Sequence, residues 1–131
     1  MFKYDKKALS THRLDTAKQN LDSSEALIMM GDFKSSINRS YYAVFHCMRA
    51  VLALNGLDFK KHSGVISKFR ELYIKTAIFD DKLSDIIVKL FDARNEADYE
   101  DFFVISKEET RMQLENAKQF FNAIEAYLHR L

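Results

Sequence analysis

Proline is absent from this sequence of 131 residues, and glycine occurs only three times. Proline breaks the interior of a helix and glycine weakens it, so a chain that nearly lacks both favours a few long helices with short connections. Eleven phenylalanines and six tyrosines supply large aromatic side chains for a core. The scarcity of helix breakers therefore predicts an all-helical protein.

Cysteine is scarce as well, since Cys47 stands alone. One cysteine excludes an internal disulfide and a CxxC metal site, and Cys47 is expected to be a small buried hydrophobe. No stretch approaches the roughly 18 apolar residues that a membrane span requires, and the opening "MFKYDKKALS" has no apolar run of a signal peptide behind it. We therefore expect a cytoplasmic protein without a membrane segment.

Charge of one sign is not in excess. Twenty basic and nineteen acidic residues leave a formal charge of +1, so any binding of nucleic acid must depend on a local site. The sequence has no glycine-rich phosphate loop and no HExxH motif, and its histidines stand one to a segment, at His12, His46, His62 and His129. From these absences we expect that the protein binds no metal and no cofactor. The length is most simply that of one domain, 1–131.

Apolar residues recur at helical spacing of three and four along most of the chain. These stripes run from Leu14 to Met30, from Phe33 to Leu52, from Val65 to Tyr73, from Leu83 to Phe91 and from Met112 to Leu128. Four long stripes and a shorter one, with short connections, predict an antiparallel up-and-down four-helix bundle with an additional short helix.

Capping residues stand where these helices are expected to begin and end. The first helix should run from about Ser10 to Met30 and stop near Gly31, with Asp32 as the cap of the next. The fourth is expected to start near Asp80 or Asp81. In "SKEE", Ser106 and Glu109 are spaced as a capping box at the head of the last helix.

Arg94 continues the apolar stripe of the fourth helix, although it carries a full positive charge. Leu83, Ile87, Leu90 and Arg94 follow at steps of four, three and four, so the guanidinium should emerge beside the core and needs a partner there. Asp98 lies one helical turn further on and is within reach. Arg94 therefore either ties the helix end to its neighbours or belongs to a site.

A second polar group follows the paired tyrosines. Arg39, Tyr42, His46 and Arg49 fall within one narrow arc of the second helix, beside its apolar stripe. Two cations, a phenol and an imidazole can hold a phosphate or a carboxylate. The same pattern is that of the polar margin of a packed amphipathic helix, so both interpretations stay open.

The segment "FKKHSGVISKFR" is the most basic short stretch of the chain. Its cationic residues accompany Ser63-Gly64, which opens the third helix, where free amides favour anions. It lacks interleaved aromatics that could stack on bases. We interpret it as a solvated loop, with its charges at Lys60, Lys61, His62, Lys68 and Arg70.

Taken in order, "INRSYYAVFHCMRAVLALNGLDFKKHSGVISKF", "RNEADYEDF" and the "SKEE" helix resemble the HEPN domain family, in its small stand-alone prokaryotic members. The resemblance extends from about Leu14 to Leu128. It implies an up-and-down helical bundle that often forms a homodimer, in a superfamily whose active members are metal-independent ribonucleases. Their signature is an arginine, usually a polar residue after it, and a histidine after four to six intervening positions.

Arg94-Asn95 matches the start of that signature, but the histidine is missing. Four intervening residues lead to Tyr99 and six lead to Asp101, and no histidine occurs between His62 and His129. A phenol with a pKa near 10 is a poor general base. Arg39 and His46 have a spacing of six, but they belong to what resembles the family's second helix, where the signature does not lie.

The resemblance implies three functional hypotheses. In the first, the chain is a nucleotide- or RNA-binding component of a toxin–antitoxin-like pair, without strong catalysis of its own. Its partner would be a minimal nucleotidyltransferase, which could modify a hydroxyl such as that of Tyr99. In the second, the chain is a metal-independent ribonuclease in which Arg94 stabilises the phosphate and Asp98, Tyr99 or His46 moves the proton. In the third, it is a structural or substrate-recruiting bundle.

Overall fold

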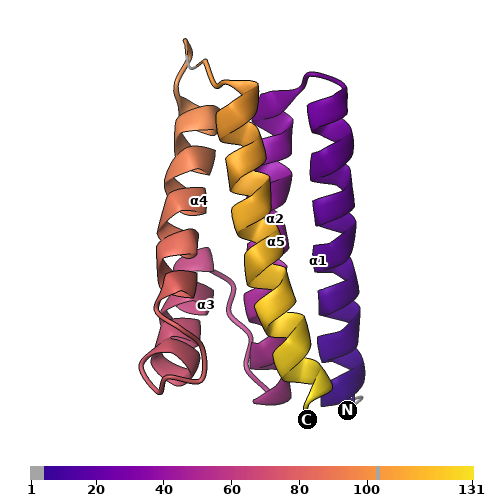
Figure 1. The fold of residues 1–131 in the computed structure, drawn as a ribbon. Coiled ribbons are helices and arrows are strands. Elements are labelled where there is room, and N and C mark those ends of the chain that lie inside the picture. Colours follow the sequence, from indigo (N-terminus) through magenta and orange to yellow (C-terminus); the bar gives the residue numbers. More distant parts are fainter. Residues whose placement is uncertain (1–4, 103) are drawn as a thin grey trace.

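The computed structural model describes residues 5–102 and 104–131, which form helices and no strand. The helices are α1 (Lys6–Met29), α2 (Phe33–Leu54), α3 (His62–Phe69), α4 (Lys82–Tyr99) and α5 (Lys107–His129). Figure 1 shows α1, α2, α4 and α5 running alternately up and down, with the short α3 beside the lower half of α4. The predicted all-α class and bundle architecture are confirmed.

Two of the predicted caps form helix starts, those of α2 and α5, whereas α1 begins at Lys6 behind Asp5, earlier than the predicted start near Ser10. Asp32 accepts a hydrogen bond from the Ser35 N–H at 3.2 Å, and Gly31 before it adopts a φ of +80°, which glycine takes without strain. Ser106 Oγ accepts from the Glu109 N–H at 3.0 Å. In a full capping box the Glu109 carboxylate would also accept from the Ser106 N–H. Here the carboxylate accepts from Gln113 Nε2 at 3.0 Å instead.

The third predicted helix is divided in two. After α3 the chain widens into a π-helical segment, η1 (Arg70–Ile74), in which the Lys75 N–H donates to the Arg70 carbonyl at 2.9 Å. Tyr73 in this segment is buried, and its hydroxyl donates to the Val51 carbonyl at 3.2 Å. The apolar spacing did not reveal the extra residue, because a π-turn retains nearly the same buried positions.

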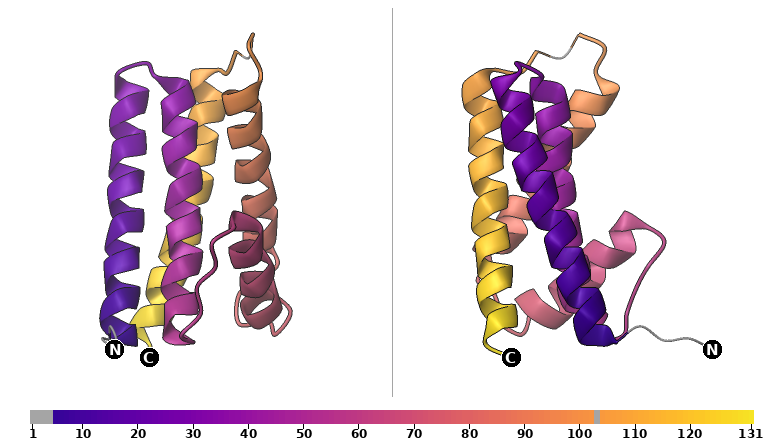
Figure 2. Two further views of the ribbon diagram at one scale, coloured as in Figure 1. Left: turned by 180° about the vertical axis from the view of Figure 1, so that it is seen from behind. Right: turned by 90° about the vertical axis from the view of Figure 1, so that its right-hand side faces the viewer.

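α2 is the central helix of the core and packs against α1, α3, α4 and α5. It contributes buried residues on most of its circumference, Cys47 among them, so the prediction for Cys47 is confirmed. Figure 2 shows α1 and α2 side by side over nearly their whole length. Their close approach uses buried hydroxyls, since Ser24 Oγ lies 2.8 Å from both Ser36 Oγ and Ser40 Oγ.

None of the helices in the described ranges combines the length and apolarity that crossing a lipid bilayer requires. α2 is the most apolar of the long helices, and its apolar residues are covered by the rest of the bundle.

Candidate functional site

The Arg94 side chain lies on two aromatic rings. Its guanidinium carbon is 4.8 Å from the centre of the Tyr41 ring and 5.5 Å from that of Tyr42, so α4 is held against α2 by cation–π contacts. The side chain is 18% exposed. The charge on the apolar stripe is therefore placed on aromatic faces at the edge of the core, with one side open to solvent.

Asp98 is the ionic partner of Arg94, as the sequence spacing predicts. Arg94 Nε lies 3.2 Å from Asp98 Oδ2. The buried Nε–H nevertheless makes no hydrogen bond within the described part of the chain, because its direction does not match the carboxylate oxygen. Arg94 is therefore paired in charge while a donor stays unsatisfied, and such a donor favours an additional acceptor.

His62 is the residue that the sequence reading misplaced. It is the first residue of α3 and is half-buried, so the interpretation of this stretch as a solvated loop is wrong for His62. Its Nδ1 lies 3.0 Å from the Tyr41 hydroxyl, and its ring centre is 4.1 Å from that of Phe45. The imidazole therefore belongs to the same aromatic cluster that supports Arg94.

Burial keeps this histidine and tyrosine uncharged at neutral pH. Burial lowers the pKa of His62, and the nearby charges of Arg94 and Arg49 lower it further. Burial also raises the pKa of the Tyr41 phenol, although the positive charge of Arg94 partly opposes this. The site therefore combines one guanidinium charge with a neutral imidazole and a protonated phenol, a set that can bind a phosphate and exchange a proton with it.

Tyr99, at the spacing of the missing histidine, is the last residue of α4 and is 75% exposed. Its neighbour Asp98 keeps about a third of its side chain exposed while it pairs with Arg94. The Tyr99 hydroxyl is therefore accessible from solvent and close in sequence to the arginine.

The four residues predicted to form one phosphate site on α2 have three different environments. Arg39 is exposed. Tyr42 lies under Arg94, with its ring centre 6.2 Å from that of His46. Arg49 pairs with Asp58 at 3.2 Å. The shared arc left open a phosphate site or the polar margin of a packed helix, and the bundle covers different parts of the arc with α1, α3 and α4.

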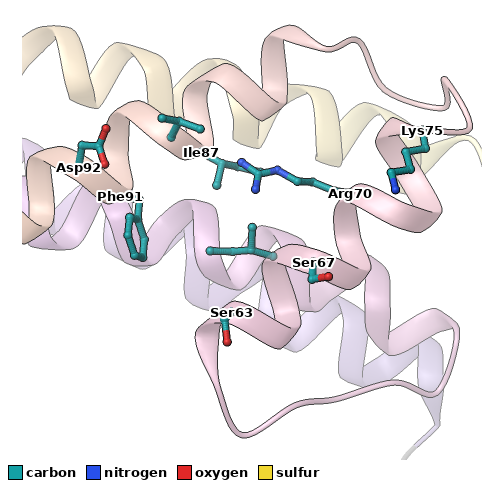
Figure 3. Close-up of a pocket in the computed structure, with 9 residues that line it drawn as sticks. Ser63, Ser67, Arg70, Lys75, Ile87, Phe91 and Asp92 are labelled. Atoms are coloured by element: carbon teal, nitrogen blue, oxygen red, sulfur yellow. The ribbon is translucent and has the colours of Figure 1, made fainter.

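A hollow of about 430 Å³ lies between α3, η1 and α4, adjacent to the Arg94 cluster. Figure 3 shows Phe91 and Asp92 toward one end and Lys75 at the other, with the Arg70 side chain extended between them. Phe91 also contacts the cluster directly, since its ring centre is 6.2 Å from that of Tyr41. The hollow has the size of a small-molecule site and two cations along it.

Tyr41 and His62 are the site residues that sequence reasoning missed. They stand 21 positions apart, so no local spacing connects them. The sequence could have indicated these two residues only through the motifs that contain them, the paired tyrosines and "KHSGVIS". Within residues 5–102 and 104–131, no group of three or more His, Cys, Asp or Glu side chains is placed to hold a metal ion.

The amino-acid sequence matches a family model and several known proteins over most of its length. The model of the HEPN domain matches residues 10–127. A protein of Methanocaldococcus jannaschii named "putative toxin" is 33% identical over 88% of this chain and 78% of its own length. A UPF0332 protein of Thermotoga maritima is 31% identical over 88% of this chain and 87% of its own. By sequence match over nearly its whole length, and by its helical bundle, this chain belongs to the HEPN domain family.

Proposed function

We propose that this protein is the toxin-like component of a two-component system and acts by binding the phosphate of RNA or of a nucleotide at Arg94. The observation that carries the proposal is the buried Arg94 Nε–H, which has no hydrogen-bond acceptor within the described residues, on a guanidinium supported by Tyr41 and Tyr42. A phosphate oxygen is the acceptor that such a fork binds best. The relative named "putative toxin" supports the biological class.

The partner in this proposal is a minimal nucleotidyltransferase, and the exposed Tyr99 is the hydroxyl it would modify. Tyr99 oxygen would attack the α-phosphorus of a nucleoside triphosphate, pyrophosphate would leave, and the phenolic proton would pass to solvent. Its 75% exposure supports access by a second protein. After incubation with that enzyme and a nucleoside triphosphate, we expect a mass gain of one nucleotidyl group on wild type and none on Tyr99→Phe. The same gain on both would exclude Tyr99.

A metal-independent ribonuclease is the second candidate, and His62 favours it. The family's histidine is absent from α4, but the structure supplies an imidazole from α3 in the cluster that holds Arg94. Burial keeps this imidazole neutral, which is the form that accepts a proton from an attacking hydroxyl. Arg94 would stabilise the charge on the phosphorane.

One experiment separates these functions. RNA binding and RNA cleavage are measured in the presence of a chelator for wild type, Arg94→Ala and His62→Gln. Arg39→Ala and His129→Gln serve as controls, because both residues are exposed. Circular dichroism confirms that each variant is folded. We expect Arg94→Ala to weaken RNA binding about tenfold or more, since a charge-assisted hydrogen bond is lost, while both controls bind as wild type.

Cleavage divides the remaining outcomes. Cleavage by wild type that both Arg94→Ala and His62→Gln abolish would establish the ribonuclease with His62 as its base. Binding without cleavage supports the binding component. Equal RNA binding by wild type and folded Arg94→Ala would refute both proposals and leave a structural or substrate-recruiting bundle.

A further inference from the structure

A second hollow, of about 570 Å³, lies between α1 and the later part of α2, where His46 and Arg49 follow Tyr42 by one and two helical turns. It is lined by basic and apolar residues, namely Ala8, Leu9, His12, Arg13, Thr16, His46 and Arg49. Two guanidinium groups and two imidazoles therefore meet at one cavity, from helices whose residues here are at least 30 positions apart in sequence.

The positive charge of this hollow is only partly compensated. Arg13 and Arg49 approach the same oxygen, Asp58 Oδ2, at 3.0 and 3.2 Å. The two arginines and the single carboxylate leave an excess of one positive charge. Burial lowers the pKa of the Arg13 guanidinium, and the neighbouring charge of Arg49 lowers it further. This is the expected effect where a buried cation has too little negative charge beside it.

Arg13 and Arg49 differ in how much of their hydrogen-bonding capacity they use. Arg13 is buried and donates both to Asp58 and, at 3.3 Å, to the Arg49 carbonyl. Arg49 is a quarter exposed and its one assigned side-chain hydrogen bond is that to Asp58. A guanidinium has five N–H donors, so Arg49, which lines the hollow and is partly open to solvent, retains donors for a ligand.

His46 lines the same hollow and contains a polar atom without a hydrogen-bond partner in the described part of the chain. Its Nδ1 is buried and has no hydrogen-bond partner within the described residues. Such atoms are rare in folded proteins, and an ordered water or an ion is one way in which they are satisfied. The ring is wedged between the Tyr42 and Phe45 rings, with centres at 6.2 and 5.6 Å, which fixes its orientation.

From these observations we propose that the hollow between α1 and α2 binds a terminal phosphate group. Arg49 is the principal hydrogen-bond donor, Arg13 contributes a buried positive charge, and His46 is a neutral hydrogen-bonding residue of the lining. A terminal phosphate has up to two negative charges and oxygens that accept from a guanidinium fork. The excess positive charge favours it over a neutral ligand. The volume and the apolar wall of Ala8 and Leu9 also accommodate the group that carries the phosphate.

A terminal phosphate can belong to a mononucleotide or to the 5′ end of an RNA chain. Both present the same chemistry to Arg49, and they are separated by the ligands chosen for the test. This site is distinct from the one proposed at Arg94, because the arginines that would bind the phosphate are different.

The test is titration of the whole protein with inorganic phosphate, AMP, adenosine, and a short RNA with either a 5′-phosphate or a 5′-hydroxyl. Binding is followed by calorimetry and by the imidazole nitrogen resonances of His46 and His12. Arg49→Gln and His46→Gln are the test variants. Arg39→Gln is the matched control, since it removes an exposed charge from the same helix outside the hollow, and Arg94→Ala reports separately on the other site.

We expect inorganic phosphate and AMP to shift the His46 and His12 resonances, and adenosine to leave them unchanged. Read from the His46 and His12 resonances, AMP binding should weaken about tenfold or more in Arg49→Gln, as expected for the loss of a charge-assisted hydrogen bond, while Arg39→Gln retains it. A preference for the 5′-phosphorylated RNA identifies RNA ends as a source of the ligand, and binding of AMP alone identifies mononucleotides.

Two results would overturn the inference. The first is equal AMP binding by wild type and folded Arg49→Gln. The second is the absence of any phosphate-dependent shift at His46 and His12. If either result is found while RNA binding still depends on Arg94, the hollow is excluded as a phosphate site and the function proposed for Arg94 is unaffected.

Discussion

At the scale of single residues, the charged guanidinium of Arg94 packs mainly against aromatic rings. Its position on Tyr41 and Tyr42 explains how an arginine continues an apolar stripe without leaving the core edge. A lysine at this position would retain the charge, but it lacks the planar face that stacks on rings and the fork that binds two oxygens. We therefore consider the guanidinium, and not its charge alone, to be the functional feature of this position.

His46 leads to a prediction about pH. Burial, followed by the charges of Arg49, Arg13, His62 and His12, lowers the pKa of His46 from 6.5 to about 4. Because folding lowers this pKa, the unfolded chain binds a proton more readily than the native protein does. The contribution of His46 to the free energy of unfolding is therefore complete above pH 6.5, the pKa in the unfolded chain, and is lost as pH falls from about 6.5 toward about 4. The unscreened shift would amount to roughly 3 kcal/mol, and since His46 is only partly buried we expect about 1–2 kcal/mol.

The measurement is urea unfolding of wild type and His46→Gln across that pH interval. The free energy of unfolding should fall more steeply with acid in wild type than in His46→Gln. His62 titrates in the same direction in both proteins, so it cancels in the difference. Parallel curves would show that His46 is charged in the native state as readily as in the unfolded chain.

The residues of the candidate site differ in how far the sequence could predict them. The pairing of Arg94 with Asp98 was predictable because it is local, one turn along one helix. The contact of His62 with Tyr41 joins two helices, so it depends on how the bundle packs. The same limit separates Arg39 from Arg49, whose shared arc says nothing about which neighbouring helix covers each.

At the scale of helices, the α1–α2 pair depends on its buried hydroxyls. Ser24 Oγ donates to the Ser36 carbonyl at 3.0 Å and contacts the hydroxyls of Ser36 and Ser40, all of them fully buried. Ser24→Ala would retain the close approach but leave these groups short of a partner. We expect a loss of about 1–3 kcal/mol in the free energy of unfolding, the usual cost of a buried polar group left unpaired.

Chemical denaturation of Ser24→Ala beside Ser23→Ala tests this, because Ser23 is the adjacent exposed serine on the same helix. Ser23→Ala should lie within about 0.5 kcal/mol of wild type. Equal stability of the two variants would mean that the hydroxyl cluster is not needed for the packing of α1 on α2.

Helix positions were well predicted where apolar stripes are long and capping residues are present. The start of α2 after Asp32 and that of α5 after Ser106 are examples. α3 was predicted less well at its end, since it passes into η1. Apolar spacing reports which residues are buried, and the buried Phe69 and Tyr73 stay four positions apart, as in an ordinary α-helix.

At the scale of the whole molecule, one core is shared by all helices, and α2 contacts every other α-helix. We therefore predict a single cooperative unfolding transition, with the same urea midpoint by circular dichroism and by tyrosine fluorescence. If the chain forms the homodimer that its family resemblance implies, the midpoint should also rise with protein concentration.

Sedimentation equilibrium under the same native conditions is the independent check on assembly. A midpoint that does not depend on concentration, together with the mass of a single chain, would contradict the homodimer. Separate transitions by the two probes would contradict a single cooperative core.

The π-turn of η1 also bears on how chains of this family can differ in length. It accommodates one more residue than an α-turn while Tyr73 and Ile74 stay buried. Loss of a single codon for the exposed Glu71 would let the turn close as ordinary α-helix with those side chains near their present positions. Loss of one codon in the middle of α2 would instead rotate every later side chain of that helix by about 100° and misalign the core. Single-residue gaps between related genes should therefore be tolerated at η1 and eliminated by selection in α2.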